Sequence, residues 1–279
     1  MVAEVPSALN LLVLPPMGWV MAGLWGALWG SFFNVAIYRV GIYESVVRPR
    51  SRCPGCGRFI AWYDNIPMLS WLLLRARCRH CHQPISARYP LVELAACAFA
   101  LLIYWRYVAI PNGDALMGLA RFQVYFAFIG CLLVLSGIDF DHQLLPNIIT
   151  YPAIPIGFVV GLILRDVRPL DLLIGLFAGY AVIAIVAELG RLAFKREAMG
   201  YGDAKLLAMI GALLGWQAVL FTFFVAPFLA LAVVVPPRLV RGKQWRGEIP
   251  YGPFLAAAAA IWIIFPPRSW PGTLRLLAP

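Results

Sequence analysis

The sequence has little charge. Asp, Glu, Lys and Arg together make up 13% of its 279 residues, about half of their share in a typical soluble domain. Hydrophobic residues make up 62%, and the mean hydropathy is +0.80. This composition excludes an ordinary soluble globular protein and predicts an all-α polytopic membrane protein whose surroundings are the lipid bilayer.

Acidic residues are the scarcer of the two charged classes. The chain has 13 Asp and Glu against 23 Lys and Arg, which gives a net charge of +10. In a soluble protein this excess would favour nucleic-acid binding, but in a multispanning protein it is typical of cytoplasmic loops. We therefore predict no nucleic-acid partner.

A basic N-terminal segment is lacking too. Glu4 is the only charged residue before the first apolar run, whereas a secretory signal peptide carries basic residues there. We therefore expect the first span to be retained. Apolar runs predict about eight transmembrane helices, at residues 14–38, 91–110, 122–138, 147–164, 172–190, 204–216, 217–235 and 251–266.

The basic residues predict the orientation of these spans. When the loops are assigned alternately to two sides, one side receives only six of the 23 Lys and Arg, namely Arg106, Arg121, Arg165, Arg168, Arg268 and Arg275. The remaining basic residues fall on the other side, which the positive-inside rule makes cytoplasmic. The prediction is a multi-pass protein of the cell inner membrane with both termini outside the cytoplasm.

One segment between spans is long and polar. The predicted organisation is a first transmembrane helix at 1–38, a cytoplasmic loop domain at 39–90 and a multispanning domain at 91–279. The loop domain is rich in Arg, Pro and Cys and too small to build a large hydrophobic core. A domain of this size needs a crosslink.

Four of the six cysteines lie in this loop as two Cys-x-x-Cys pairs. Cys53 with Cys56 and Cys78 with Cys81 are separated by 21 residues, a spacing typical of four thiolates around one tetrahedral Zn²⁺. We predict a structural zinc in a zinc-ribbon-like loop domain. Two disulfides and four unligated thiols are the alternatives, and the two histidines near the second pair are competing ligands.

Two aspartates stand beside apolar runs. Asp139 follows the third run, and Asp203 precedes the sixth, so the parity of the loops places both carboxyl groups on the cytoplasmic side. Two carboxyl groups brought together share a proton and suit acid–base catalysis, and Gly200 and Gly202 leave room for an extended substrate. Ordinary interfacial charge is the alternative for a lone acid, and it is our interpretation of Asp141.

With these residues the sequence resembles the prepilin peptidase family, and more distantly the intramembrane aspartic proteases with a Gly-x-Gly-Asp motif. The resemblance covers nearly the whole chain, and its motifs are Gly30–Val35, the cysteine loop, Asn65–Pro67, Ser86–Glu93, Asp139–Asn147, Gly200–Lys205 and Pro250–Phe254. It implies that Asp139, seven residues before Pro146, and Asp203 are the catalytic acids.

The resemblance also implies the reaction. Members of the family remove the short basic leader of type IV prepilins or type II secretion pseudopilins at the cytoplasmic face of the membrane. Members with a long first loop also methylate the new N-terminus with S-adenosylmethionine. For this second activity we consider Asp64, Asn65 and Glu93, which lie in or beside the loop.

Two hypotheses from other classes use the same residues. In a transporter or channel, Asp139 and Asp203 would form an ion or proton path. In a zinc-bearing membrane scaffold of a secretion assembly, the cysteine loop would carry the function and neither acid would be needed.

Overall fold

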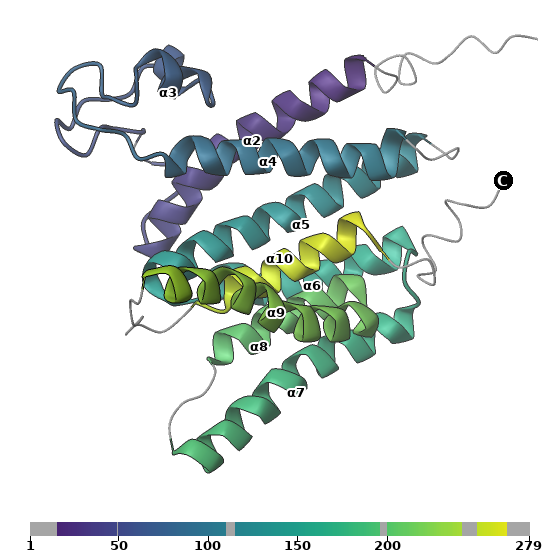
Figure 1. The fold of residues 1–279 in the computed structure, drawn as a ribbon. Coiled ribbons are helices and arrows are strands. Elements are labelled where there is room, and N and C mark those ends of the chain that lie inside the picture. The colour runs from purple at the N-terminus through teal and green to yellow at the C-terminus, as the bar shows by residue number, and fades with distance from the viewer. Residues whose placement is uncertain (1–15, 49, 110–114, 196–199, 242–249, 267–279) are drawn as a thin grey trace, which may run out of the picture. The chain divides into compact units, whose positions relative to one another are not determined.

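The structure is a computed structural model that describes residues 16–48, 50–109, 115–195, 200–241 and 250–266. Over these ranges it contains helices and turns and no β-strand (Figure 1). The long helices are α2 (Met17–Gly41), α4 (Arg88–Tyr104), α5 (Ala115–His142), α6 (Asn147–Leu164), α7 (Pro169–Phe194), α8 (Tyr201–Leu214), α9 (Trp216–Arg241) and α10 (Gly252–Ile264). A helix thus lies at each of the eight predicted spans, and the all-α prediction is confirmed.

Six of the helices are long and apolar enough to cross a membrane. They are α2, α4 together with the π-helical turn η2 (Trp105–Ala109), α5, α6, α7 and α9. Helices α8 and α10 are shorter, with 14 and 13 residues. The multi-pass prediction is therefore confirmed. Residues 14, 15 and 110 of the predicted spans, and Arg268 and Arg275 of the charge comparison, lie outside the described residues.

The chain forms two compact units, Met1–Val134 and Leu135–Pro279, and helix α5 contributes to both. In the first unit, α2 ends at Gly41 and α4 begins at Arg88. The polar segment between them, residues 42–87, contains the 3₁₀ helix η1 (Trp62–Asn65) and the short helix α3 (Leu69–Leu73). We call it the loop segment.

Helices α2 and α4 of the first unit pack with their backbones close together. A Cβ atom added to Gly26 would lie 2.7 Å from both the Ala96 carbonyl oxygen and the Ala100 Cβ, and one added to Gly30 would lie 2.7 Å from the Glu93 Cα. Small residues four apart allow such an approach, which provides van der Waals packing where lipid offers no hydrophobic driving force.

Aromatic rings join the first part of α5 to these helices. Phe126 of α5 lies 6.2 Å from Phe33 of α2 between ring centroids, and it stacks on Phe122 at 6.0 Å. Tyr125 packs on Tyr107 of η2 at 4.8 Å. These rings are buried, and aromatic pairs at such distances stabilise a core beyond their buried area.

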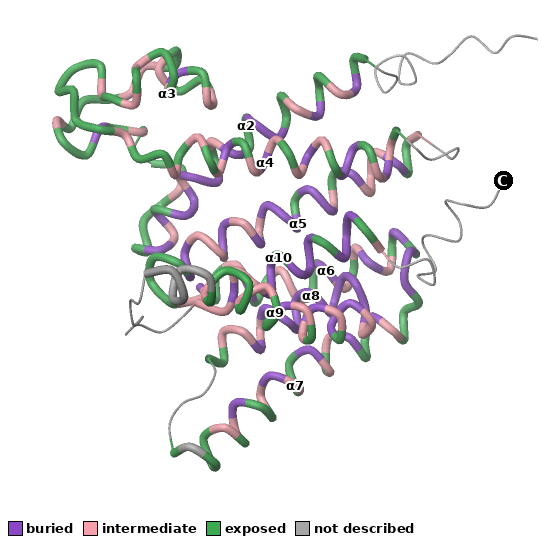
Figure 2. The backbone as a smooth tube through the Cα atoms, viewed as in Figure 1, coloured by how far each residue is buried: buried purple, intermediate pink, exposed green. Residues whose placement is uncertain are grey.

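Helix α8 lies at the centre of the second unit, in contact with α6, α7, α9 and α10. Its residues from 206 to 214 are all buried (Figure 2). Glycines bring α7 against it: a Cβ on Gly175 would lie 2.6 Å from the Gly211 carbonyl oxygen, and one on Gly179 would lie 2.5 Å from that of Leu207. The chain then leaves α8 at Gly215, whose φ of +83° suits glycine.

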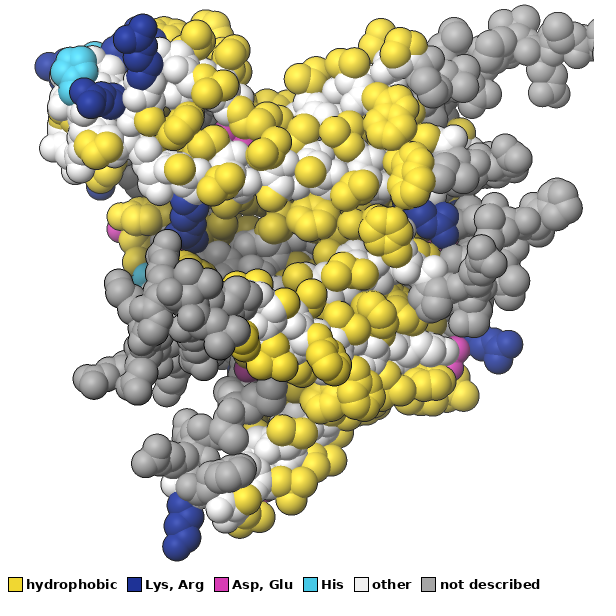
Figure 3. Space-filling model, viewed as in Figure 1, with side chains coloured by type: hydrophobic (Ala, Val, Ile, Leu, Met, Phe, Trp, Pro, Cys, Tyr) yellow, Lys and Arg dark blue, Asp and Glu magenta, His cyan; other side chains and the backbone are white. Residues whose placement is uncertain are grey.

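The outer faces of the helices are apolar. Figure 3 shows hydrophobic side chains covering the visible faces of the helices, while Arg and His side chains gather at the outer end of the loop segment. Exposed Leu28 of α2, Ile163 of α6 and Phe228 of α9 are examples of this coat. A lipid-facing surface of this kind is what a polytopic protein requires.

The contact between α2 and α4 gives a test. Changing Gly26 to Ala should lower the free energy of unfolding by about 1–3 kcal/mol, because the new methyl group overlaps the backbone of α4. Thermal unfolding followed by circular dichroism in detergent measures this. The matched control is Gly23→Ala, whose Cβ would make ordinary contacts at 3.6 Å or more. Equal stability of the two variants would contradict the packing.

Candidate functional site

The four loop cysteines converge on one point of the first unit. One sulfur from each of Cys53, Cys56, Cys78 and Cys81 lies within 4.8 Å of the others, and the Sγ atoms of Cys53 and Cys81 are 3.7 Å apart. Four thiolates bound tetrahedrally at about 2.3 Å from a metal would be about 3.8 Å apart. The cluster therefore fits a metal ion with little movement.

The two Cys-x-x-Cys pairs have the same local structure. In each, the first Cys donates its backbone N–H to the carbonyl five residues later, and the residue after the second Cys donates back to the first. These hydrogen bonds measure 2.9–3.0 Å: Cys53 to Arg58, Gly57 to Cys53, Cys78 to Gln83 and His82 to Cys78. An isolated antiparallel bridge flanks each pair, Arg52 with Phe59 and Arg77 with Pro84. The predicted ribbon-like form is thus built from two matching turns.

The residue after each second Cys shows what this turn requires. Gly57 has a φ of +68°, and His82, at the equivalent place, has a φ of +56°. Positive φ is free of steric cost for glycine and unfavourable for histidine. His82 therefore occupies a position set by the backbone, and the compact set of sulfur atoms is complete without it.

Backbone N–H groups and neighbouring sulfurs shift the protonation of two of these cysteines in opposite directions. Backbone N–H groups of Cys81 and His80 lower the pKa of the Cys78 thiol to about 6. The backbone N–H of Gln83 lowers the pKa of Cys81, but burial and the neighbouring sulfurs outweigh it and raise that pKa to about 11. One thiolate thus forms readily, and a bound cation would favour ionisation of the rest.

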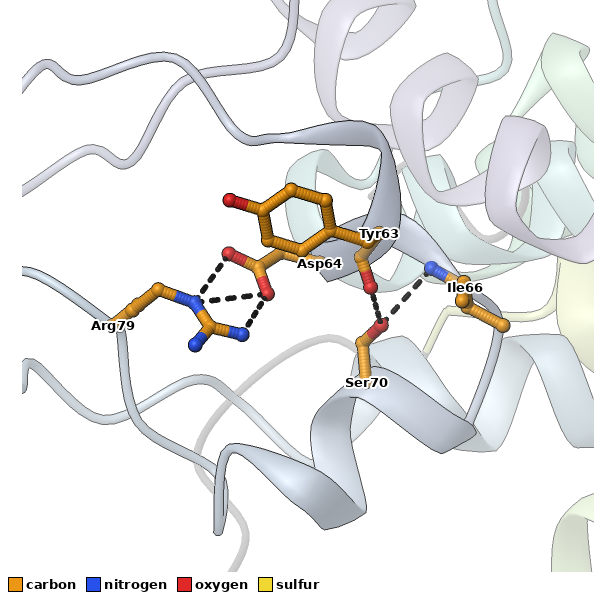
Figure 4. Close-up of polar contacts among 5 residues, drawn as sticks. All are labelled: Tyr63, Asp64, Ile66, Ser70 and Arg79. Carbon is orange, nitrogen blue, oxygen red and sulfur yellow. Dashed lines mark hydrogen bonds and ion pairs between the residues drawn. The ribbon is translucent and has the colours of Figure 1, made fainter.

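The loop segment is held together by a second cluster, shown in Figure 4. Arg79 donates from Nε and Nη2 to the Asp64 carboxylate at 2.6–3.1 Å, and its guanidinium lies over the Tyr63 ring. The ion pair lowers the pKa of Asp64. Ser70 accepts from the Ile66 N–H and donates to the Tyr63 carbonyl, both at 3.0 Å. These contacts join η1 to α3 and to the second Cys pair.

The three residues considered for methyl transfer have separate surroundings. Asp64 accepts from Arg79, and Asn65 is exposed at the end of η1. Glu93 is buried in α4, and its Oε2 accepts the Met68 N–H at 2.6 Å. Asp64 and Glu93 therefore each have a partner of their own, Arg79 for Asp64 and the Met68 N–H for Glu93.

In the second unit, Asp139 lies in the last turn of α5 and Asp203 in the first turn of α8. Asp139 is 6% exposed, and its Oδ2 accepts the N–H of Gly252, the first residue of α10, at 3.0 Å. The N–H groups of a first helical turn have no partner within their helix, so the carboxylate satisfies one of them. A Cβ on Gly252 would lie 2.7 Å from the same oxygen.

Asp203 lies close enough to Asp139 to sense its charge. Asp203 precedes the apolar part of α8 and lies outside the six span-capable helices. Burial and, to a smaller extent, the Asp139 carboxylate raise the pKa of Asp203 to about 7. Burial and the charge of Asp203 raise the pKa of Tyr251 to about 12. The start of α10 therefore adjoins both acids.

The remaining motif residues hold the start of α8 against the start of α6. A Cβ on Gly202 would lie 3.2 Å from the Leu145 Cβ, and Lys205 Nζ donates to Asn147 Oδ1 at 2.8 Å. Pro146 is buried, and its carbonyl accepts the first backbone hydrogen bonds of α6. Gly200 precedes α8 and is exposed.

Sequence reasoning missed Gly252 and Tyr251. Both belong to the Pro250–Phe254 motif, to which we gave no role from the sequence. Asp141, interpreted as an interfacial charge, is exposed at the end of α5. The arrangement as a whole places two carboxyl groups and a backbone N–H at one end of α5, α8 and α10, which suits activation of water and protonation of a leaving group.

Comparison with known proteins links both units to one family. Residues 24–107 match the family described as Bacterial Peptidase A24 N-terminal domain, and residues 126–235 match the Type IV leader peptidase family. The second match contains Asp139 and Asp203. No solved structure matches the chain significantly.

Curated relatives share the name "Prepilin leader peptidase/N-methyltransferase". One from Pseudomonas putida is 34% identical over 92% of this chain and 94% of its own length. One from Klebsiella pneumoniae is 39% identical over 78% of this chain and 97% of its own. One from Myxococcus xanthus is 41% identical over 77% of this chain, but the match covers only 61% of that protein.

The cysteine cluster gives a test that needs no assay of activity. The purified chain should contain one metal ion, measured by elemental mass spectrometry, and Cys53→Ser should lose it because a ligand is removed. The matched variant His82→Gly should keep the metal and unfold at a higher temperature, since glycine relieves the positive φ. Loss of metal from His82→Gly, or full retention in Cys53→Ser, would contradict the four-sulfur site.

Proposed function

Because the chain belongs to the type IV leader peptidase family, we propose that it is a membrane aspartic endopeptidase that removes the leader of prepilins or pseudopilins. The observation that carries this proposal is the pairing of Asp139 and Asp203 at the ends of two helices. Both lie within the matched family region, and the charge of one affects the protonation of the other.

The geometry favours different roles for the two acids. The raised pKa of Asp203, about 7, allows it to carry a proton near neutral pH. Asp139 accepts the Gly252 N–H, as a carboxylate does. We therefore assign Asp139 as the base that takes a proton from water. Asp203 is the acid that donates a proton toward the substrate.

The bonds of the reaction follow from these roles. The hydroxide left by deprotonation adds to the carbonyl carbon of the scissile peptide, and Asp203 protonates the carbonyl oxygen. The tetrahedral intermediate then collapses, the C–N bond breaks, the proton held by Asp139 passes to the leaving amine, and one hydroxyl of the intermediate returns a proton to Asp203. The products are the leader with a new carboxylate and the mature chain with a free amine.

The membrane supplies part of the positioning. A prepilin anchored by its own apolar helix would carry its leader at the bilayer surface, where the ends of α5 and α8 lie in this proposal. Confinement of both proteins to one bilayer reduces the entropy cost of bringing them together. The distribution of Lys and Arg supports the proposal that this surface is the cytoplasmic face of the inner membrane.

We also propose the second activity carried in the relatives' name. The new N-terminal amine would attack the methyl carbon of S-adenosylmethionine, the methyl–sulfur bond would break, and the amine would lose a proton. Asp64, Asn65 and Glu93 remain the candidates in the first unit. Glu93, which is buried and negatively charged when ionised, suits a position near the sulfonium or the amine.

We infer that the metal of the cysteine cluster is zinc and that its role is structural. Zn²⁺ favours four thiolates in a tetrahedron, and a full set of four leaves no open position for water. The bound metal would join the two halves of the loop segment. The cysteines themselves supply the ligands, and the chemistry of cleavage stays with the aspartates.

The transporter hypothesis receives no support from the described residues. Asp139 and Asp203 lie at a helix end and a helix start, whereas transporters place coupling groups near the middle of the membrane. The scaffold hypothesis predicts no dependence on either acid, so the same variants test it.

Replacing either acid should stop cleavage. Asp139→Asn and Asp203→Asn should each lower kcat/KM by at least about a hundredfold, because one removes the base and the other the acid. A prepilin-type peptide incubated with the purified chain in lipid, with S-adenosylmethionine present, is read by mass for cleavage and for the gain of one methyl group.

The matched control is Asp141→Asn, two residues from Asp139 and exposed, which should cleave normally. Normal cleavage by either variant of the pair would refute the dyad. An unmodified chain that cleaves no prepilin-type peptide would count against the proposed function as a whole.

The contact of Gly252 with Asp139 gives a second prediction. Gly252→Ala should lower kcat/KM by at least about tenfold. The new methyl group would lie 2.7 Å from the Asp139 Oδ2, too close for both to keep their places, and would displace the carboxylate from the Gly252 N–H. Gly157→Ala is the control, since its Cβ would make ordinary contacts at 3.5 Å or more. Equal activity of the two variants would show that the position of this carboxylate does not depend on α10.

A further inference from the structure

The loop segment exposes an apolar patch that neither the cysteine cluster nor the dyad uses. We call it the η1–α3 patch, and it consists of Trp62, Tyr63, Ile66, Leu69, Leu72 and Leu73. The exposed fractions of Trp62, Leu72 and Leu73 are 77%, 64% and 72%. Exposed apolar side chains gathered in this way mark an interaction surface.

Helix α3 has an inner and an outer side. Ser70 is buried and bonded to η1 (Figure 4), and the Trp71 Nε1 donates to the Ile85 carbonyl at 3.1 Å. Leu69, Leu72 and Leu73 are exposed on the other side. The inner residues attach α3 to its own segment, so the outer leucines are available to a partner.

The position of α3 relative to α4 shows at which level of the membrane the patch lies. Met68, the residue before α3, donates its N–H to Glu93 at 2.6 Å. Glu93 is the sixth residue of α4, about 7 Å along the helix axis from its first residue. Figure 1 likewise shows α3 alongside the first turns of α4 rather than beyond its end. The patch therefore lies at the level where a spanning helix enters the bilayer.

Neighbouring residues fit the same surroundings. Leu91 and Leu94 in the first turns of α4 are also exposed, as expected of a lipid-facing helix. Trp62 and Tyr63 are of the types that favour the boundary between lipid and water. Residues 42–87 contain seven arginines and two acids, and Asp64, one of these acids, is bound to Arg79. The net positive charge suits anionic lipid headgroups.

We propose that the η1–α3 patch inserts into the headgroup and upper acyl region of the bilayer beside α4, so that the loop segment lies on the membrane. Its partner is phospholipid. Both ends of the segment continue into the span-capable helices α2 and α4, which keeps the patch at the bilayer surface. This proposal does not depend on the peptidase function.

Photo-crosslinking identifies the occupant directly. The full-length chain carrying p-benzoylphenylalanine in place of Leu72 is placed in nanodiscs containing phosphatidylglycerol and irradiated, and the adducts are read by mass. A phospholipid adduct should form at least about ten times more than with the same probe at His82, since burial of a leucine-sized side chain favours lipid by such a factor. His82 is exposed and directly follows the second Cys pair.

The lipid charge and the alternatives are tested in the same experiment. Replacing phosphatidylglycerol by phosphatidylcholine should lower the Leu72 lipid adduct several-fold, because the arginines lose their counterpart. Equal lipid labelling at the two positions would overturn the proposal, and so would adducts of Leu72 mainly to residues 135–279 or to added prepilin. Leu73, also exposed, provides a second probe position if the Leu72 variant does not fold.

Discussion

Close contact between helix backbones is the constraint on which the second unit depends. In a bilayer the apolar faces of helices gain little by leaving lipid, so helices stay together through tight packing. Gly175 and Gly179 of α7 let the backbone of α8 approach directly. Helix α8 is thereby enclosed on all sides by its neighbours, and the residue at its start, Asp203, takes its position from them.

The enclosure of α8 explains how an acid is tolerated there. A carboxyl group at the edge of a membrane is costly unless it has partners. Asp139 has the N–H that begins α10, and Asp203 has a raised pKa that lets it carry a proton. The second unit thus stabilises Asp139 with one backbone donor and lets Asp203 carry a proton, and these two states are the base and the acid that the proposed reaction needs.

The sequence was informative wherever the signal was local. The eight apolar runs predicted the eight long helices because burial, in lipid for the six span-capable helices and among neighbouring helices for α8, requires uncharged stretches, and α6 has the predicted bounds. The predicted bounds of α5, 122–138, were too narrow. The helix runs from Ala115 to His142, and the residues at its two ends are more polar than those at its centre. The two Cys pairs were visible because their spacing alone defines the turn.

The contacts that arrange the site are not local. Gly252 and Asp139, which are in contact, are 113 positions apart in the chain. From the sequence, the glycine beside a proline indicates only a turn, and nothing in that pattern indicates that an acid lies nearby. The sequence could place the two aspartates only on the same side of the membrane. Loop parity gives the side and does not give the distance between the two carboxyl groups. Their catalytic roles, like those of the loop residues, remain predictions.

The matching turns of the loop segment have a consequence for how the protein responds to its surroundings. Each turn holds two sulfurs and no large core, and 21 residues lie between the pairs. A metal ion that joins them acts as a crosslink, which limits the freedom of the chain between them. On the proposed cytoplasmic side, where disulfides do not persist, such a crosslink would form when the four sulfurs bind the metal and open when the metal leaves. The shape of this segment would then depend on the bound metal, and the cysteines must stay reduced to hold it.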